Sequence, residues 1–126
     1  MECIQLVVRL SLQVHIQLVN MNWIILIIAG LFEVGFTFCL GKIKGATGTD
    51  FYLWGAGFVI SVILSMFLLA KAAQTLPIGT AYPVWTGIGA VGTVLIGILF
   101  FHEPATLGRL FFMTTLIISI VGLKLI

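Results

Sequence analysis

The feature that most constrains this chain is a set of four long segments that are almost free of charged side chains. About 20 mostly apolar residues are needed to cross the hydrocarbon core of a bilayer as a helix. Lipid offers the backbone no hydrogen-bond partners, so each such segment is expected to be α-helical. The sequence therefore predicts an all-α membrane protein with four transmembrane helices. The predicted spans are residues 23–40, 51–70, 79–101 and 107–126.

The composition argues against a soluble protein. Of the 126 residues, 61% are hydrophobic and only 8% are charged, and the mean hydropathy is +1.27. Soluble domains carry about 25% charged residues, so this chain has too few to cover a surface that faces water. The net charge of +2 is scattered along the chain. Because no basic cluster is present, we expect no nucleic-acid partner.

The sequence contains no arrangement that is typical of an enzyme. It has no nucleophile–base pattern, no phosphate-binding loop and no metal-ligand spacing. His102 and Glu103 are adjacent, but two ligands are too few for a metal site, and we expect a solvated turn there. Cys3 and Cys39 are not expected to form a disulfide. We therefore predict no enzymatic activity, no metal and no cofactor.

The first twenty residues differ from the rest. Apolar and polar side chains nearly alternate there, and a period of two favours a strand over a transmembrane helix. Met21 directly precedes the first span and is a plausible native start, so we interpret residues 1–20 as an extension without function. The alternative is an interfacial segment that lies on the membrane. Residues 21–126 then form one four-helix transmembrane domain, in which short connections make neighbouring helices antiparallel.

The basic residues predict almost no preferred orientation in the membrane. Four spans place both termini on one side, and the count of basic residues is three on each side, or two against three without residues 1–20. Orientation depends on an excess of Lys and Arg on the cytoplasmic side. A chain without that excess is expected to insert both ways, so that two copies pair antiparallel as an inverted repeat. The two sets are Arg9, Lys71 and Lys124, and Lys42, Lys44 and Arg109.

One acidic residue, Glu33, lies near the middle of the first span, in the sequence "LIIAGLFEVGFTF". A charged side chain there costs about 2.5–3.5 kcal/mol on insertion scales, and such residues usually mark ion or substrate pathways. A carboxylate can hold a proton or an organic cation, and the two exclude each other. This is the minimal chemistry of antiport. A neutral, hydrogen-bonded structural role is the alternative, and the interiors of the spans offer no Lys or Arg as a partner.

Helical spacing predicts which residues surround Glu33. Gly30, Phe36 and Thr37 lie three or four positions away and share its face. We expect Gly30 to leave space beside the carboxylate and Thr37 to donate a hydrogen bond. On the second span, Ser65 lies four residues after Ser61 on a hydroxyl-bearing face. The alternative for these serines is a hydrogen bond to a carbonyl of their own helix.

The third span supplies aromatic residues and glycines. Tyr82 and Trp85 are three residues apart, where a Tyr hydroxyl can reach a carboxylate and a Trp face can take a cation. An aromatic belt at the membrane interface is the alternative. Gly87 and Gly89 permit close packing or bending, and Pro83 also favours a bend. The fourth span carries a stripe of small residues that is typical of a helix–helix contact, namely Thr115, Ser119 and Gly122.

Three segments, "WIILIIAGLFEV", "LPIGTAYPVWTGIGAVG" and "GLKLI", resemble the small multidrug resistance family over residues 21–126. The pattern "GTAYxxWTGIGAxG" is more similar to its guanidinium exporters than to its quaternary-ammonium exporters. The resemblance implies a multi-pass protein of the bacterial inner membrane that works as an antiparallel, dual-topology homodimer. It also implies alternating access, with protons exchanged for cationic substrates.

The resemblance also implies roles for single residues. Glu33 would bind proton or substrate, Ser65, Tyr82 and Trp85 would line the substrate pocket, and Gly30 would match the family's glycine one turn before the glutamate. The third helix would kink at Gly87–Gly89, and Thr115 to Gly122 on the fourth helix would contact the partner. Three positions depart from the family pattern, namely Phe36, where guanidinium exporters usually carry Trp, Pro83, and Gly41, where a lysine is usual.

The expected function is proton-coupled export of guanidinium and small guanidinylated or alkylated cations. Phe36 has no N–H donor, so a broader exporter of quaternary ammonium or other drug cations is the first alternative. One subunit of a heterodimeric pair, without transport of its own, is the second. Protons are the expected coupling ion.

Overall fold

The structure is a computed structural model that describes residues 1–126, and it contains four α-helices and no strands. All four are long and apolar enough to cross a membrane. The helices α2 to α4 each include most or all of a predicted span. The bounds are α1 Glu2–Ile43, α2 Thr49–Ala72, α3 Ile78–Phe100 and α4 Leu107–Leu125.

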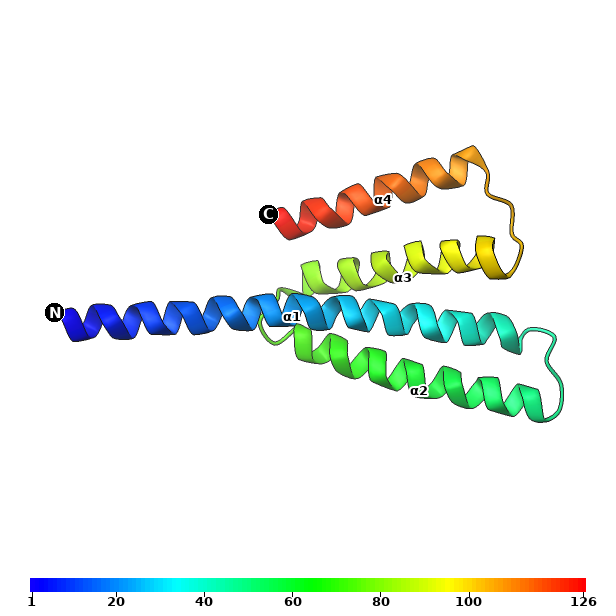
Figure 1. Ribbon diagram of the computed structural model, residues 1–126, viewed down its shortest axis with the longest axis horizontal. Coiled ribbons are helices and arrows are strands. Elements are labelled where there is room, and N and C mark those ends of the chain that lie inside the picture. The colour runs from blue at the N-terminus through cyan, green and yellow to red at the C-terminus, as the bar shows by residue number, and fades with distance from the viewer.

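The prediction of a strand in the first twenty residues is wrong. These residues form the N-terminal half of α1, a continuous helix of 42 residues. A strand needs a neighbour to accept its backbone hydrogen bonds, and the chain provides none there, whereas a helix satisfies them within the segment. No Gly or Pro interrupts residues 1–20. At about 1.5 Å per residue, α1 is about 63 Å long, so its N-terminal half extends beyond the other helices (Figure 1).

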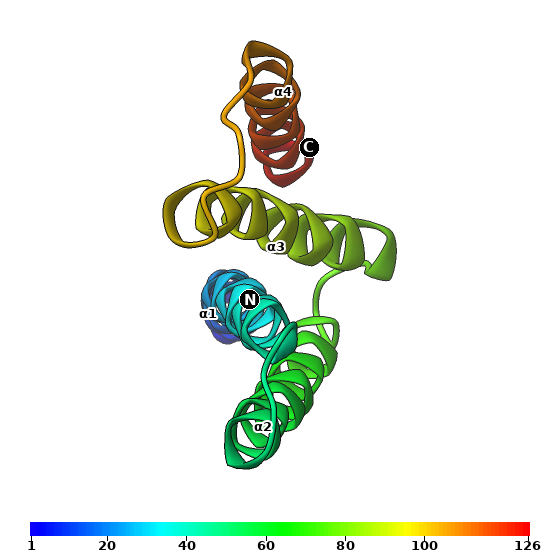
Figure 2. The same ribbon diagram turned by 90° about the vertical axis from the view of Figure 1, so that its right-hand side faces the viewer.

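The helices are arranged around α1 and α3. The helix α1 packs against both α2 and α3, whereas α4 packs against α3 alone. An end-on view shows α3 between α4 and α1, with α2 on the far side of α1 (Figure 2). The α1–α2 and α3–α4 loops lie at the same end of the molecule (Figure 1). No residue of α4 is buried.

Turn residues explain where the helices end. The α1–α2 loop contains Gly45 and Gly48 at φ +85° and +66°, in the left-handed region that favours glycine. Pro77 directly precedes α3, where a missing backbone N–H costs nothing. The side chain of Thr106 accepts a hydrogen bond from the backbone N–H of Arg109 at 3.3 Å and so caps α4.

The core is small and lies where α1, α2 and α3 meet near the α2–α3 loop. Outside it, most large apolar side chains are exposed, as expected for a surface that lipid covers. Asn22 of α1 donates a hydrogen bond to the Thr75 hydroxyl and closes this end. The core residues are Leu26, Ala29, Leu69, Ala72, Leu76, Ala81, Val84 and Trp85.

Candidate functional site

Glu33 lies at the contact between α1 and α3. Its side chain is half-buried, and its carboxyl group packs directly against Gly89. A Cβ atom at position 89 would collide with that carboxyl group, so only glycine leaves room for it there. The Oε2 atom is buried and has no hydrogen-bond partner within the chain. Buried polar atoms without a partner are rare and often mark function.

Ser65 and Trp85 form a buried hydrogen-bond chain next to this contact. The indole Nε1 of Trp85 donates to Ser65 Oγ at 2.9 Å, and Ser65 Oγ donates to the carbonyl of Ala29 at 2.8 Å. Ser65 is fully buried and Trp85 nearly so. The chain joins α3, α2 and α1 one helical turn before Glu33. The alternative that Ser65 bonds a carbonyl of its own helix is therefore wrong, since its acceptor is on α1.

The aromatic residues predicted for the site pack against other side chains of α2 and α3. Tyr82 is more than half exposed, and its ring centroid lies 5.4 Å from that of Trp85. Phe36 packs edge-on against Phe58, with 5.8 Å between ring centroids. The indole N–H of Trp85 donates to Ser65, so Trp85 has no free N–H donor for the Glu33 carboxylate.

Thr37, a predicted site residue, forms a hydroxyl pair with a residue of α3. Its hydroxyl donates to the carbonyl of Val34 at 2.8 Å and lies 2.8 Å from the hydroxyl of Thr93 on α3. Thr93 was not predicted. The signal available in the sequence was its spacing, because Thr93 follows Gly89 by four residues, as Thr37 follows Glu33.

A cavity of about 770 Å³ opens beyond this hydroxyl pair, between the C-terminal halves of α1 and α3. Thr37 and Thr93 line it, one helical turn from Glu33 and Gly89, which is roughly 6 Å along the axis. Charged side chains also line it, where the loops meet. These are Lys44, Glu103 and Arg109.

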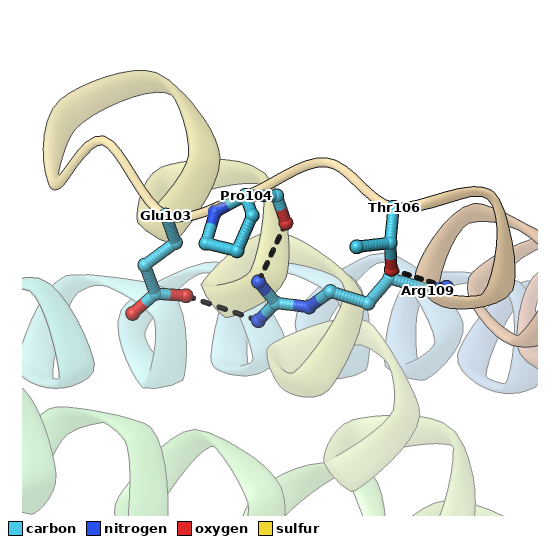
Figure 3. A network of polar contacts seen from close by, with 4 residues as sticks. All are labelled: Glu103, Pro104, Thr106 and Arg109. Carbon is cyan, nitrogen blue, oxygen red and sulfur yellow. Dashed lines mark hydrogen bonds and ion pairs between the residues drawn. The ribbon is translucent and has the colours of Figure 1, made fainter.

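The α3–α4 loop holds a polar network beside the cavity (Figure 3). Arg109 Nη2 lies 3.0 Å from Glu103 Oε2 in an ion pair, and Nη1 donates to the carbonyl of Pro104 at 3.0 Å. The carboxylate of Glu103 packs over Gly97, and the backbone N–H of Glu103 donates to the carbonyl of Gly97 at 2.9 Å. Glu103 and the neighbouring His102 are both exposed, as expected for a solvated turn, and of the two only Glu103 takes part in this network.

The glycines make close contacts that differ from one another. Gly30 is buried against the side chain of Ile88, so the expectation that it leaves space beside the carboxylate is wrong. Gly87 faces Leu116 and Ile120 of α4. Gly89 faces Glu33. The helix α3 runs without a break through Pro83 and these glycines.

The predicted contact stripe on α4 is available on the surface. Thr115 and Ser119 are exposed, and their hydroxyls donate to the carbonyls of Phe111 and Thr115. Gly122 has no neighbouring side chain within 4 Å of where a Cβ would lie. Nothing in the chain packs on this stripe.

Comparison with known proteins identifies the family. A model described as Small Multidrug Resistance protein matches residues 21–116. The chain belongs to the small multidrug resistance family. This confirms the resemblance described above, and it fits a multi-pass bacterial membrane protein with four membrane-spanning helices.

Curated relatives cover most of this chain. A guanidinium exporter of Yersinia pseudotuberculosis is 45% identical over 105 residues, which is 83% of this chain and 98% of the relative. A probable guanidinium efflux system subunit, GdnD, of Bacillus licheniformis is 48% identical over 107 residues, 84% of this chain and 99% of the relative. A guanidinium exporter of Escherichia coli K12 is 46% identical over 105 residues, with 83% and 97% covered. All three relatives are named as exporters or as part of an efflux system.

Proposed function

We propose that the chain is a proton-coupled antiporter that exports guanidinium and small guanidinylated or alkylated cations by alternating access. The observation that carries the proposal is Glu33, the acidic residue in the middle of an apolar helix, whose buried Oε2 has no partner within the chain. The names of three relatives supply the cargo class, since two are guanidinium exporters and one is a probable guanidinium efflux subunit.

The chemistry at Glu33 explains why transport of the two species is coupled. A planar guanidinium presents parallel N–H donors that match the two oxygens of a carboxylate. A protonated carboxyl group has lost the charge that attracts the cation, so binding of one species releases the other. Protons are therefore the coupling ion, and no cofactor is needed. The hydrogen-bonded Ser65 and Trp85 hold the three helices around this group in register.

We also propose that two copies assemble antiparallel through α4. This helix buries none of its residues and contacts only α3, so its outer face is free to meet a partner. Thr115, Ser119 and Gly122 lie on a small-residue stripe that permits close approach of helices in lipid. The nearly equal numbers of basic residues on the two sides permit both orientations in the membrane.

Two alternatives have specific support. Phe36 packs on Phe58 and supplies an aromatic face without a donor, which favours bulkier cations such as quaternary ammonium. The relative from Bacillus licheniformis is named as a subunit of an efflux system, which favours a pair of different chains.

Transport by the purified chain tests the proposal. The protein is reconstituted alone, and substrate-driven proton currents are measured with guanidinium and with tetrapropylammonium. We expect currents with guanidinium and weaker currents with tetrapropylammonium. Equal or stronger currents with tetrapropylammonium would support the broad exporter instead. Currents that appear only when a second, related chain is added would overturn the homodimer.

A further inference from the structure

We propose that the α3–α4 loop carries a second guanidinium-binding site, formed by the carboxylate of Glu103 and the carbonyl oxygen of Pro104. The chain's own Arg109 occupies this site in the structure, and a cargo cation exchanges with it on its way between the cavity and the water. The inference rests on the proposed function, because it takes guanidinium as the cargo.

The geometry of the α3–α4 loop shows that it binds a guanidinium group. The side chain of Arg109 ends in a guanidinium, the same planar group as the free ion. One of its terminal nitrogens lies 3.0 Å from Glu103 Oε2, and the other lies 3.0 Å from the carbonyl oxygen of Pro104 (Figure 3). A free guanidinium has the same planar set of N–H donors and therefore fits the same two acceptors.

Glu103, the acidic acceptor, is held in place by contacts that do not involve Arg109. The backbone N–H of Glu103 is bonded to the carbonyl of Gly97 at 2.9 Å, and the Glu103 carboxylate lies over the bare Cα of the same glycine. His102 turns the chain with φ +54° and fixes the direction in which Glu103 leaves α3. The site is therefore expected to keep its shape when the Arg109 side chain swings away.

Arg109 is a competitor that a cation can displace. The side chains of Arg109 and Glu103 are 36% and 48% exposed, and ion pairs at such positions contribute little net stability because water screens them. The tether gives Arg109 a high local concentration at the site, so it weakens the binding of a free cation without preventing it. Removal of the Arg109 guanidinium should therefore strengthen the binding of cargo.

The position of the site explains its use. Glu103 is the only acidic residue that lines the cavity, and Lys44 and Arg109 are the basic ones. A cation that enters is repelled by the basic residues and attracted by Glu103 alone. From there the cavity reaches Thr37 and Thr93, one turn from Glu33. The cation thus binds at Glu103 after it leaves the aqueous phase and before it reaches Glu33.

Opposite effects of two substitutions on the same ion pair test this proposal. In reconstituted protein, Glu103→Gln should raise the KM for guanidinium by about twofold to fivefold, which is the range for an exposed ion pair. Arg109→Gln should lower the KM by a similar factor, and the double variant should resemble Glu103→Gln. Arg9→Gln, which removes a basic residue distant from the cavity, is the control for net charge. If the pair only fastened the loop, both single variants would shift the KM in the same direction, and that result would overturn the proposal, as would no shift in either.

A binding measurement tests the site without transport. The chain has only two arginines, Arg9 and Arg109, so their 15N-labelled side-chain Nε–H signals are readily assigned with an Arg9→Lys variant. In a Glu33→Gln background, guanidinium chloride should move the Arg109 signal more than sodium chloride at equal ionic strength. In Glu103→Gln the signal should start near the displaced position. Equal responses to both salts would overturn the site.

The two proposals fail in distinguishable ways. Absence of guanidinium currents in the unmodified protein contradicts the proposed function, whatever the loop does. Guanidinium currents that persist while the Arg109 signal ignores guanidinium contradict the loop site alone.

Discussion

Two carboxylates of this chain, those of Glu33 and Glu103, differ in their surroundings. Glu33 is half-buried at the α1–α3 contact and has a buried oxygen with no partner, whereas Glu103 is exposed and paired with Arg109. Glu33 therefore has an oxygen that no group within the chain satisfies. Glu103, in the α3–α4 loop, has a partner that belongs to the chain, Arg109. Under the two proposals above, the unpartnered Glu33 suits exchange of a proton for a cation, and the replaceable partner of Glu103 suits initial binding of the cation.

We expect the strongest loss of transport when the Glu33 carboxylate is removed. Glu33→Gln keeps the size of the side chain but can neither release a proton nor attract a cation, so coupled guanidinium currents should fall to background. Glu103→Gln should retain the maximal rate and change only the KM. Solid-supported-membrane currents over a range of guanidinium concentrations measure both. Full coupled transport by Glu33→Gln would contradict the proposed mechanism and the proposed difference in role between Glu33 and Glu103.

The second effect concerns the space that Glu33 occupies. In Gly89→Ala the new methyl group would collide with the Glu33 carboxyl group, so the side chain or the helix must shift. Overpacking of this kind costs about 1–3 kcal/mol, and we expect transport to fall strongly while the protein still inserts.

Gly108→Ala is the matched control for this change, since no atom lies within 4 Å of a Cβ at position 108. Its transport should equal that of the unmodified protein. Equal activity of Gly89→Ala would show that the carboxylate does not need its position against α3.

The third effect concerns the hydrogen-bond chain beside Glu33. Ser65→Ala leaves the buried indole N–H of Trp85 without an acceptor, which costs about 1–3 kcal/mol. Thermal unfolding in detergent should show this loss, together with a lower transport rate.

Adding Trp85→Phe to Ser65→Ala removes the orphaned donor, so the double variant should lose less stability than the sum of the two single changes. Ser61→Ala, one turn away, changes a serine with no recorded hydrogen bond and should have little effect. Additive losses for Ser65 and Trp85 would argue against the bond.

The smallest expected change is in stability, and it concerns the backbone of the α3–α4 loop at His102. His102 has φ +54°, a conformation that costs a residue with a side chain about 1–3 kcal/mol and that glycine adopts freely. Because glycine also makes the unfolded chain more flexible, His102→Gly should stabilise the protein by about 1 kcal/mol or less. The KM for guanidinium should not change. A loss of stability would mean that the His102 side chain itself holds the loop.

The sequence was sufficient to predict the fold class and the family. Charge-free segments of the right length indicate membrane-crossing helices because lipid excludes other backbone structures, and the third-span motif indicated the family that the family model then matched. Residues 1–20 were misread because a period of two in side chains does not make a strand where no neighbouring strand exists. The assignment of those residues as a separate extension stays a prediction.

The candidate site could be predicted where a residue stands out within its own segment. Glu33 does so, because a lone acid in an apolar helix is unusual. The acceptor of Ser65, the neighbour of Gly30 and the pairing of Thr37 with Thr93 depend on how α1, α2 and α3 are rotated about their axes, which spacing within one helix does not determine. The roles assigned to Tyr82 and Phe36, and the contact stripe on α4, stay predictions.

The helix α4 has a consequence for how such proteins diversify. It packs on α3 through its inner side, where Leu116 and Ile120 meet Gly87. Substitutions on its outward face would leave the neighbours of Glu33 untouched. In the antiparallel dimer proposed above, a duplicated gene can therefore evolve a new choice of partner while inheriting its choice of cargo.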